Sequence, residues 1–205
     1  MSKRSKEILD AAARLFGENG YDATGIRDIA KAVGINSASL YYHYKNKDEI
    51  LCETACYGVR MLQDAVETAM LAERTLLNQL YAGVVTHIDT ILSHQALARV
   101  LLHESQQLTR EFAAQVITAR DRYEQLWMNK LHEGVTLGVI QANLNLHLTR
   151  LLCFGAANWA ITWYRSDGQY TPQEIANTLF NLLAPGFLTA QAQQQWKERV
   201  NNEHE

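Results

Sequence analysis

The stretch TGIRDIAKAVGINSASLYYHYKNKDEIL, residues 24–51, decides how the N-terminal part of the chain folds. Its apolar side chains recur at helical spacing before a glycine, at Ile26, Ile29, Ala30 and Val33. Gly34 follows, and glycine readily adopts the left-handed conformation that ends a helix. Asn36 or Ser37 can then cap a new helix at once. Two short helices joined by a tight glycine turn form a helix-turn-helix.

A further helix is predicted on the N-terminal side of this pair, over residues 4–18. Its apolar side chains also recur at helical spacing, at Ile8, Ala12, Leu15 and Phe16. Asn19 and Gly20 are expected to end this helix, and Thr24 can cap the one that follows. Three consecutive helices are therefore predicted before residue 47.

The third predicted helix, residues 37–43, has few side chains that could serve a core. Its first turn holds three small residues, Ser37, Ala38 and Ser39. A recognition helix brings its first turn against base edges in the major groove of DNA. Its end holds three hydrogen-bond donors suited to phosphate oxygens, Tyr41, Tyr42 and His43. The alternatives are surface side chains, a protein contact, or serines that only cap the helix; the spacing of the whole set favours DNA.

A fourth helix is predicted to begin just after Asn46. Asn46 and Glu49 have the spacing of a capping box, in which side chains satisfy free backbone N–H groups at a helix start. Those N–H groups and Lys47 together form a site for one more phosphate. The helical pattern then continues without a breaker from residue 48 to about residue 72, which predicts one long helix between the two parts of the chain.

The glycine turn, the Leu-Tyr-Tyr-His run at 40–43 and the Lys-Asn-Lys link at 45–47 together resemble the DNA-binding signature of the TetR family of repressors. The resemblance covers residues from about 6 to 51. It implies an all-α protein with a three-helix DNA-binding domain at 1–47 and a helical domain at 48–205. In this family the second domain forms a homodimer and binds an inducer. The implied function is a repressor that a small apolar ligand releases from a palindromic operator on double-stranded DNA.

The resemblance also assigns roles to single residues. It implies base contacts from Arg27, Ser37, Ala38 and Ser39. It implies phosphate contacts from Thr24, Tyr41, Tyr42, His43 and Lys47. Ala38 departs from the family pattern, which often has glycine or proline at this position. Because Ala38 and its serine neighbours offer little bidentate hydrogen bonding, base specificity is expected to rest on Arg27, on thymine methyl groups or on DNA shape.

The charge distribution separates the same two parts of the chain. Residues 1–47 carry a net charge of +3 and the remainder carries −6. A weakly basic N-terminal part joined to an acidic remainder is typical of a nucleic-acid-binding module attached to a domain that does not bind phosphate. No apolar run approaches the length of a membrane span, and the basic N-terminus leads into an amphipathic pattern instead of an apolar signal segment. We therefore expect a cytoplasmic protein without membrane contact.

The remaining composition favours an ordinary helical protein. Strand-like alternation is hard to find, and only Pro172 and Pro185 interrupt the chain. Cys52, Cys56 and Cys153 are an odd number without the paired-cysteine pattern of a zinc site, so buried thiols are predicted. A redox or metal role for Cys52 and Cys56 is the alternative.

The C-terminal part is predicted to be a series of helices, at about 74–93, 95–106 and 109–136 and then at 146–165 and 171–184. Thr171 and Glu174 have the capping-box spacing at the start of the last helix, and Pro185 is expected to end it. The TetR resemblance implies that the helices at 146–165 and 171–184 join their counterparts in a four-helix dimer interface.

Residues 158–168 and 171–176 are also similar to a branch of the TetR family that senses acyl-coenzyme A thioesters. A pocket for such an effector needs an apolar tunnel, a few polar groups and positive charge for the phosphates. The candidate ligand-binding residues are Phe112, Trp127, Arg150, Phe154 and Trp159, with Arg120, Arg122 and Arg165 as further cations. The alternative is that these aromatic residues belong to the core and the arginines to the surface.

Other functions find little support in the sequence. His87, His94 and His103 do not stack on adjacent turns of one helix, so neither a metal site nor a cofactor is expected. No nucleophile elbow, phosphate loop or metal-ligand helix motif occurs, so no catalytic residue is assigned. Glu104 beside His103 is the nearest acid–base pair, but adjacent helical residues point in different directions. An enzyme, and a ligand-independent or activating DNA-binding regulator, remain the alternatives.

Overall fold

The computed structural model describes residues 1–202, so the last three residues of the predicted domain at 48–205 lie outside it. Within the described range, the chain forms ten α-helices and one short 3₁₀ helix, and the only extended pairing is a single bridge between Ile140 and Leu188. The prediction of an all-α fold is confirmed. None of the helices in residues 1–202 combines the length and the apolar character needed to cross a bilayer.

The chain divides into two compact units. The first comprises residues 1–62 and 93–123, and the second comprises residues 63–92 and the chain from residue 124 onward. Helices α4 (Lys47–Leu71) and α7 (Arg110–Thr136) contribute residues to both units. The division of function between residues 1–47 and 48–205 stays a prediction.

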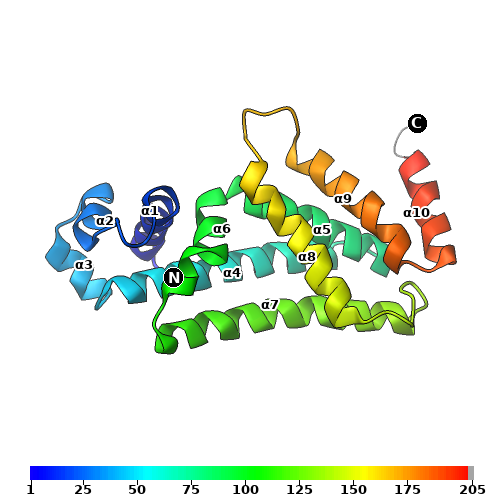
Figure 1. Cartoon of the computed structure of the whole chain (residues 1–205), viewed down its shortest axis with the longest axis horizontal. Helices are drawn as coiled ribbons and strands as arrows, with labels where there is room; N and C mark the ends of the chain where they lie inside the picture. Colours follow the sequence, from blue (N-terminus) through cyan, green and yellow to red (C-terminus); the bar gives the residue numbers. More distant parts are fainter. Residues whose placement is uncertain (203–205) are drawn as a thin grey trace. The chain divides into compact units, whose positions relative to one another are not determined.

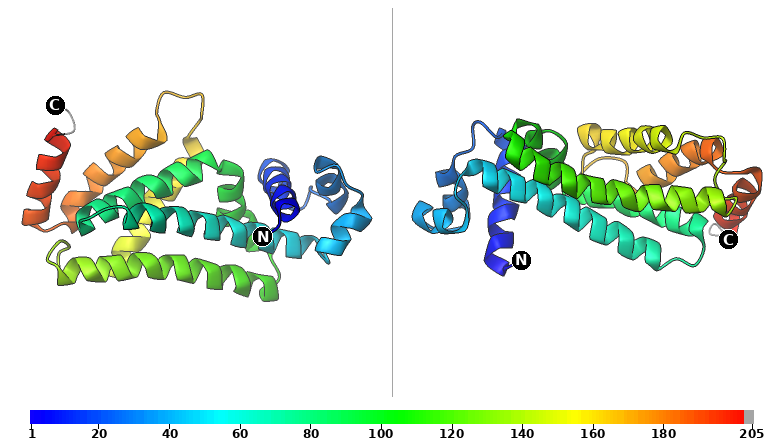
Figure 2. Two further views of the ribbon diagram at one scale, coloured as in Figure 1. Left: turned by 180° about the vertical axis from the view of Figure 1, so that it is seen from behind. Right: turned by 90° about the horizontal axis from the view of Figure 1, so that it is seen from below.

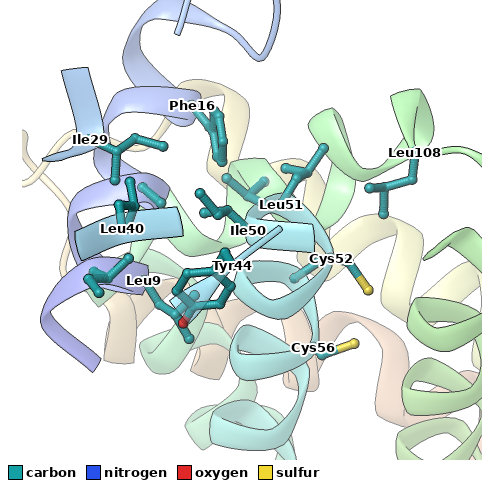
Figure 3. Packing of buried hydrophobic residues seen from close by; sticks show 14 of the residues in the cluster. Leu9, Phe16, Ile29, Leu40, Tyr44, Ile50, Leu51, Cys52, Cys56 and Leu108 are labelled. Carbon is teal, nitrogen blue, oxygen red and sulfur yellow. The ribbon is translucent and has the colours of Figure 1, made fainter. Parts of the chain in front are cut away.

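The first unit contains the three N-terminal helices, shown in blue in Figure 1, with α6 and its neighbours. The elements that lie wholly in this unit are α1 (Lys3–Asn19), α2 (Ile26–Ala32), α3 (Ser37–His43), α6 (Gln95–Leu102) and η1 (Glu104–Gln107). Helix α1 packs against α2 and α6, and α2 packs against α3. Figure 3 shows the shared core, in which Phe16, Ile29 and Leu40 from the three N-terminal helices meet Ile50 and Leu51 from α4.

The predicted turn between α2 and α3 is confirmed in detail. Gly34 has a φ of 69°, the left-handed conformation that permits the tight turn. Asn36 caps α3, because its side-chain oxygen accepts a hydrogen bond from the backbone N–H of Ser39 at 2.7 Å. Asn46 likewise accepts from the N–H of Glu49 at the start of α4, at 2.8 Å. The Glu49 carboxylate, however, accepts from the N–H of Lys45, one residue before the donor of a capping box.

The predicted cap of α2 is wrong. Gly25, not Thr24, is the N-cap residue, and its backbone N–H donates to the Asp28 carboxylate at 2.8 Å. The hydroxyl of Thr24 turns inward and donates to the carbonyl oxygens of Leu15 and Gly20. Thr24 therefore ties the end of α1 to the following loop instead of opening α2.

The second unit contains most of α5 (Leu76–Ser93) together with α8 (Leu146–Trp163), α9 (Pro172–Phe187) and α10 (Ala190–Asn202). Helices α8 and α9 pack against each other, and Figure 2 shows the sharp turn from α9 into α10. The predicted capping box of α9 is confirmed, since Thr171 and Glu174 each accept from the other's backbone N–H.

Helix α9 continues past Pro185, where the sequence suggested an end. The helix stops only after Phe187, where the chain pairs with the segment after α7. The N–H of Gln141 donates to the carbonyl of Phe187, and the N–H of Thr189 donates to that of Val139, both at 3.0 Å. These long-range hydrogen bonds, invisible in the local pattern, set the position of the helix end.

Candidate nucleic-acid interface and ligand cavity

Helix α3 is anchored by two buried side chains and leaves its remaining surface open. Leu40 and, just beyond the helix, Tyr44 are buried in the core of the first unit (Figure 3). Most of the predicted DNA-contacting residues are exposed, namely Arg27, Ala38, Ser39, Tyr41, Tyr42 and His43. Ser37 and Lys47 are half-buried. The anchoring of α3 thus presents its first turn and its tyrosines together on the outside of the unit.

Tyr42 is the clearest candidate for a contact with another molecule. Its side chain is 88% exposed, so packing within the chain does not explain a tyrosine here. Its ring meets that of His43 edge to face, with 5.6 Å between centroids. The hydroxyl of Tyr42 and the imidazole of His43 are therefore neighbouring hydrogen-bond donors at the end of α3, as phosphate binding requires.

Lys47, at the start of α4, is held by Tyr21 in the loop between α1 and α2. Its ammonium group donates to the Tyr21 carbonyl at 2.9 Å and lies 4.1 Å from the centre of the Tyr21 ring. The Tyr21 hydroxyl donates to Asp48, and burial, followed by this hydrogen bond, raises the pKa of Tyr21. This cluster fixes a positive charge at the N-terminus of α4, where phosphate binding is favoured.

Thr24 does not belong to this exposed set. Its side chain is 2% exposed, and its hydroxyl is engaged with Leu15 and Gly20 as described above. We therefore leave Thr24 out of the candidate interface and treat it as a residue that shapes the loop.

The second unit encloses a cavity of about 60 Å³ between α5, α7, α8 and α9. Three of the five predicted ligand-binding residues line it: Trp127, Arg150 and Phe154. Phe112 instead packs against the core of the first unit. Trp159 points outward and is 66% exposed.

The aromatic wall of the cavity includes His87, which the sequence offered only as a metal ligand. The rings of Trp127 and His87 both meet Phe154 edge to face, at 5.1 Å and 4.9 Å between centroids. His87 is 3% exposed, and one ring nitrogen shares a hydrogen bond with the side-chain oxygen of Asn158 at 3.1 Å. Burial lowers the pKa of His87 to about 4, so the imidazole is neutral at physiological pH.

Arg150 carries a buried positive charge beside this wall. Its side chain is 5% exposed, and one terminal nitrogen lies 2.7 Å from a carboxylate oxygen of Glu124 on α7. Sequence reasoning missed Glu124. Asp121 and Glu124 lie close together on α7, and nothing in the sequence distinguishes them. Only the packing of α7 against α8 shows that Glu124 is the partner of Arg150.

The exposed surface of α8 and α9 is unusually apolar. Large apolar side chains there are open to solvent in the single chain, namely Leu148, Leu151, Leu152, Trp159, Trp163 and Leu182. Several of them recur at helical spacing along α8, and Gly155 lies between Leu152 and Trp159 with open space around it. A contiguous apolar stripe of this kind is typical of a protein interface.

Two family models match the chain, one near its N-terminus and one in the remainder. A model of bacterial regulatory proteins of the tetR family matches residues 8–54, and a model of the tetracyclin repressor-like C-terminal domain matches residues 73–187. The chain belongs to the TetR family. The resemblance seen in residues 24–51 is thereby confirmed, and it extends over both parts of the chain.

Named regulatory proteins are among its relatives. The HTH-type transcriptional repressor KstR2 of Rhodococcus jostii is 31% identical over 190 residues, covering 90% of this chain and 91% of that protein. The fatty acid metabolism regulator protein of Bacillus subtilis is 27% identical over 187 residues, covering 90% and 96%. The structure of the transcriptional regulator FadR from Bacillus subtilis in complex with stearoyl-CoA has a TM-score of 0.77 at 26% identity, covering 88% and 98%. These relatives are transcriptional regulators, which fits a protein that is not an enzyme.

The prediction of buried thiols is confirmed for Cys52 and Cys56 and wrong for Cys153, which is only partly buried and lines the cavity of the second unit. Cys52 and Cys56 are buried in the first unit (Figure 3), where burial raises the pKa of Cys52 to about 12 and also raises that of Cys56. Thiols with raised pKa values are poor nucleophiles and poor metal ligands. Among the described residues, no group of three or more His, Cys, Asp or Glu side chains is arranged to hold a metal ion.

Proposed function

We propose that this protein is a homodimeric repressor that an acyl-coenzyme A thioester, or a closely related apolar ligand, releases from a palindromic operator. One observation carries the proposal: the second unit encloses an apolar, aromatic-walled cavity with a single buried arginine at its edge. An apolar lining with few polar groups is typical of a ligand site. In this assignment residues 1–47 bind DNA, and residues 48–205 dimerise and bind the effector.

The exposed surface of α3 supports the DNA-binding part. Ser37, Ala38 and Ser39 offer short side chains to the major groove, while Tyr41, Tyr42 and His43 reach phosphates on either side. Arg27, exposed on α2, supplies the long donor that the first turn of α3 lacks. Specificity then rests on Arg27, on thymine methyl contacts and on DNA shape.

The apolar stripe of α8 and α9 supports the homodimer. A two-fold axis brings the same stripe of a second copy onto the first and buries both, as in other isologous interfaces. The two DNA-binding domains related by that axis bind two half-sites, which is why the operator is expected to be palindromic.

The relatives favour repression and an acyl thioester effector. KstR2 is named as a transcriptional repressor, and the FadR structure holds stearoyl-CoA. The cavity here has about 60 Å³, well below the roughly 300 Å³ or more of usual ligand pockets. Binding a long acyl chain therefore requires the cavity walls to move apart, and a ligand that favours the opened state shifts the conformational equilibrium.

The test is release of DNA by acyl-CoA thioesters. Fluorescence anisotropy would follow the purified protein bound to a labelled palindrome from upstream of its own gene, at fixed moderate salt. A series from butyryl-CoA to stearoyl-CoA is added, with free coenzyme A as the control. We expect one range of chain lengths to lower the anisotropy, while coenzyme A leaves it unchanged.

Two results would contradict the proposal. If acyl-CoA binds but the protein stays on DNA, or its affinity for DNA increases, the protein would be an activator. DNA binding without any effect of acyl-CoA on either anisotropy or thermal stability would indicate a regulator independent of this ligand class.

A further inference from the structure

The polar groups at the cavity are not equally available to a ligand. The hydroxyl of Thr149 donates to the carbonyl of Asn145 at 2.9 Å, and the His87 ring is paired with Asn158. Each of these lining side chains makes one hydrogen bond within the unit. Arg150 differs from both because it carries a full charge, and part of its guanidinium group is not engaged by the described residues.

Arg150 has one donor to spare. Its terminal nitrogen is paired with Glu124, but its Nε atom is buried and has no hydrogen-bond partner within residues 1–202. A guanidinium is always charged and its Nε–H always a donor. A buried donor without an acceptor is unfavourable, so a ligand that brings an acceptor to this atom gains more than it would at a solvated group.

Glu124 decides which kind of acceptor suits this position. The carboxylate of Glu124 already balances the charge of Arg150 at 2.7 Å. A ligand carboxylate at Nε would place a second negative charge beside the first at a buried arginine, although the Glu124 side chain itself is 42% exposed and partly screened by solvent. A neutral carbonyl oxygen accepts the same hydrogen bond without adding charge.

We propose that Arg150 and Glu124 form a selectivity pair that accepts an acyl group with a neutral carbonyl, a thioester or ester, and rejects the corresponding free carboxylate. Arg150 Nε donates to the carbonyl oxygen, and the acyl chain lies against Trp127, Phe154 and the neighbouring apolar wall. This inference rests on the proposed function, since it assumes that the effector enters this cavity. It adds the reason why the thioester, and not the fatty acid released from it, acts as the signal.

The experiment compares two probes that share one acyl chain, the chain that releases DNA best in the series above. One probe is its N-acetylcysteamine thioester, which is neutral and lacks the nucleotide of coenzyme A; the other is the sodium salt of the fatty acid. Isothermal titration calorimetry gives both affinities for the full-length protein. The wild type is expected to bind the thioester at least tenfold more tightly than the acid.

Two variants test the two members of the pair, Arg150 with its donor and positive charge and Glu124 with its negative charge. Arg150→Met removes the donor and is expected to weaken thioester binding about tenfold or more. Glu124→Gln keeps a partner for Arg150 but removes its negative charge, and is expected to raise affinity for the free acid about tenfold. The matched controls are Arg74→Met and Glu198→Gln, which change exposed residues of the same types. Thermal unfolding shows whether each variant folds, and Glu124→Gln tests the inference even where Arg150→Met does not fold.

The outcomes are distinct. If the wild type binds the thioester but Glu124→Gln keeps the full preference over the acid, the inference is overturned while the proposed function stands. Equal binding of thioester and acid by the wild type overturns it as well. If the wild type responds to no acyl-CoA in the series, the proposed function fails and this inference fails with it.

Discussion

The backbone N–H of Tyr21 donates a hydrogen bond to the carboxylate of Glu104, 83 positions further along the chain, at 2.8 Å. Glu104 opens η1, directly after α6. The same tyrosine donates its hydroxyl to Asp48 and accepts from Lys47 through its carbonyl. The loop between α1 and α2 is thereby tied both to the start of α4 and to η1, and its position is set by a residue far outside the helix-turn-helix.

We expect Glu104→Ala to weaken this connection measurably. The variant leaves the Tyr21 N–H without its charged acceptor, which should lower the free energy of unfolding by about 1–2 kcal/mol. Operator affinity should fall too, because Lys47 loses a fixed support. Urea denaturation and DNA anisotropy measure the two effects. Glu111→Ala, an exposed acidic residue of α7, is the control, and a Glu104→Ala protein that matches it in both assays would show the hydrogen bond to be dispensable.

Tyr42→Phe tests the proposed phosphate contact at the end of α3. Removing only the hydroxyl should weaken operator binding by about 1 kcal/mol, roughly fivefold, because one hydrogen bond is lost. The salt dependence should keep its slope, since a neutral side chain releases no counterion. Tyr170→Phe changes another exposed tyrosine and should leave binding unchanged. Wild-type affinity in the Tyr42→Phe protein would remove this residue from the interface.

The apolar stripe predicts the behaviour of two charge substitutions on α8. Leu152→Glu and Trp159→Glu each place a charge on the stripe and should convert a dimer into a folded monomer, because an unpaired buried charge opposes association. Sedimentation velocity measures the change, and operator affinity should fall with it. Leu71→Glu alters an equally exposed leucine outside α8 and α9 and should remain dimeric. A dimer that tolerates both α8 substitutions would place the interface elsewhere.

His87 predicts a specific pH dependence of stability. Its pKa is about 4 in the folded protein and near 6.5 when unfolded, so only the unfolded state takes up the proton between these values. Stability is unaffected above pH 6.5, falls as the pH drops from 6.5 toward 4, and loses about 3 kcal/mol in total from this group. His87→Gln should flatten the curve in that window relative to wild type, whereas His132→Gln, at an exposed position, should not. Parallel curves for all three proteins would contradict the assignment.

Local rules were sufficient where neighbouring residues decide the structure. Gly34 and Asn36 act within a few positions of themselves, so the turn and the start of α3 were predictable, as was the capping box at Thr171. The same rules failed for Thr24. Its hydroxyl donates to the carbonyl oxygens of Leu15 and Gly20, so it is not available to cap α2.

The cavity was less predictable, because its members meet only after folding. Periodicity marks Trp127 and Phe112 alike as apolar positions on α7, yet the first lines the cavity and the second packs in the other unit. Trp159 and Phe154 lie on the same helix but face opposite ways. Assigning His87 and Glu124 requires knowing which helices pack together, and composition and spacing do not contain that information.

Under the proposed function, the small volume of the cavity affects how much ligand is needed for a response. A ligand that must part the walls binds only the fraction of molecules that have opened, so its apparent dissociation constant exceeds the intrinsic one by the inverse of that fraction. Tight packing around Phe154 should therefore raise the ligand concentration at which the regulator responds. A smaller side chain in the cavity wall should lower that concentration, and a larger one should raise it.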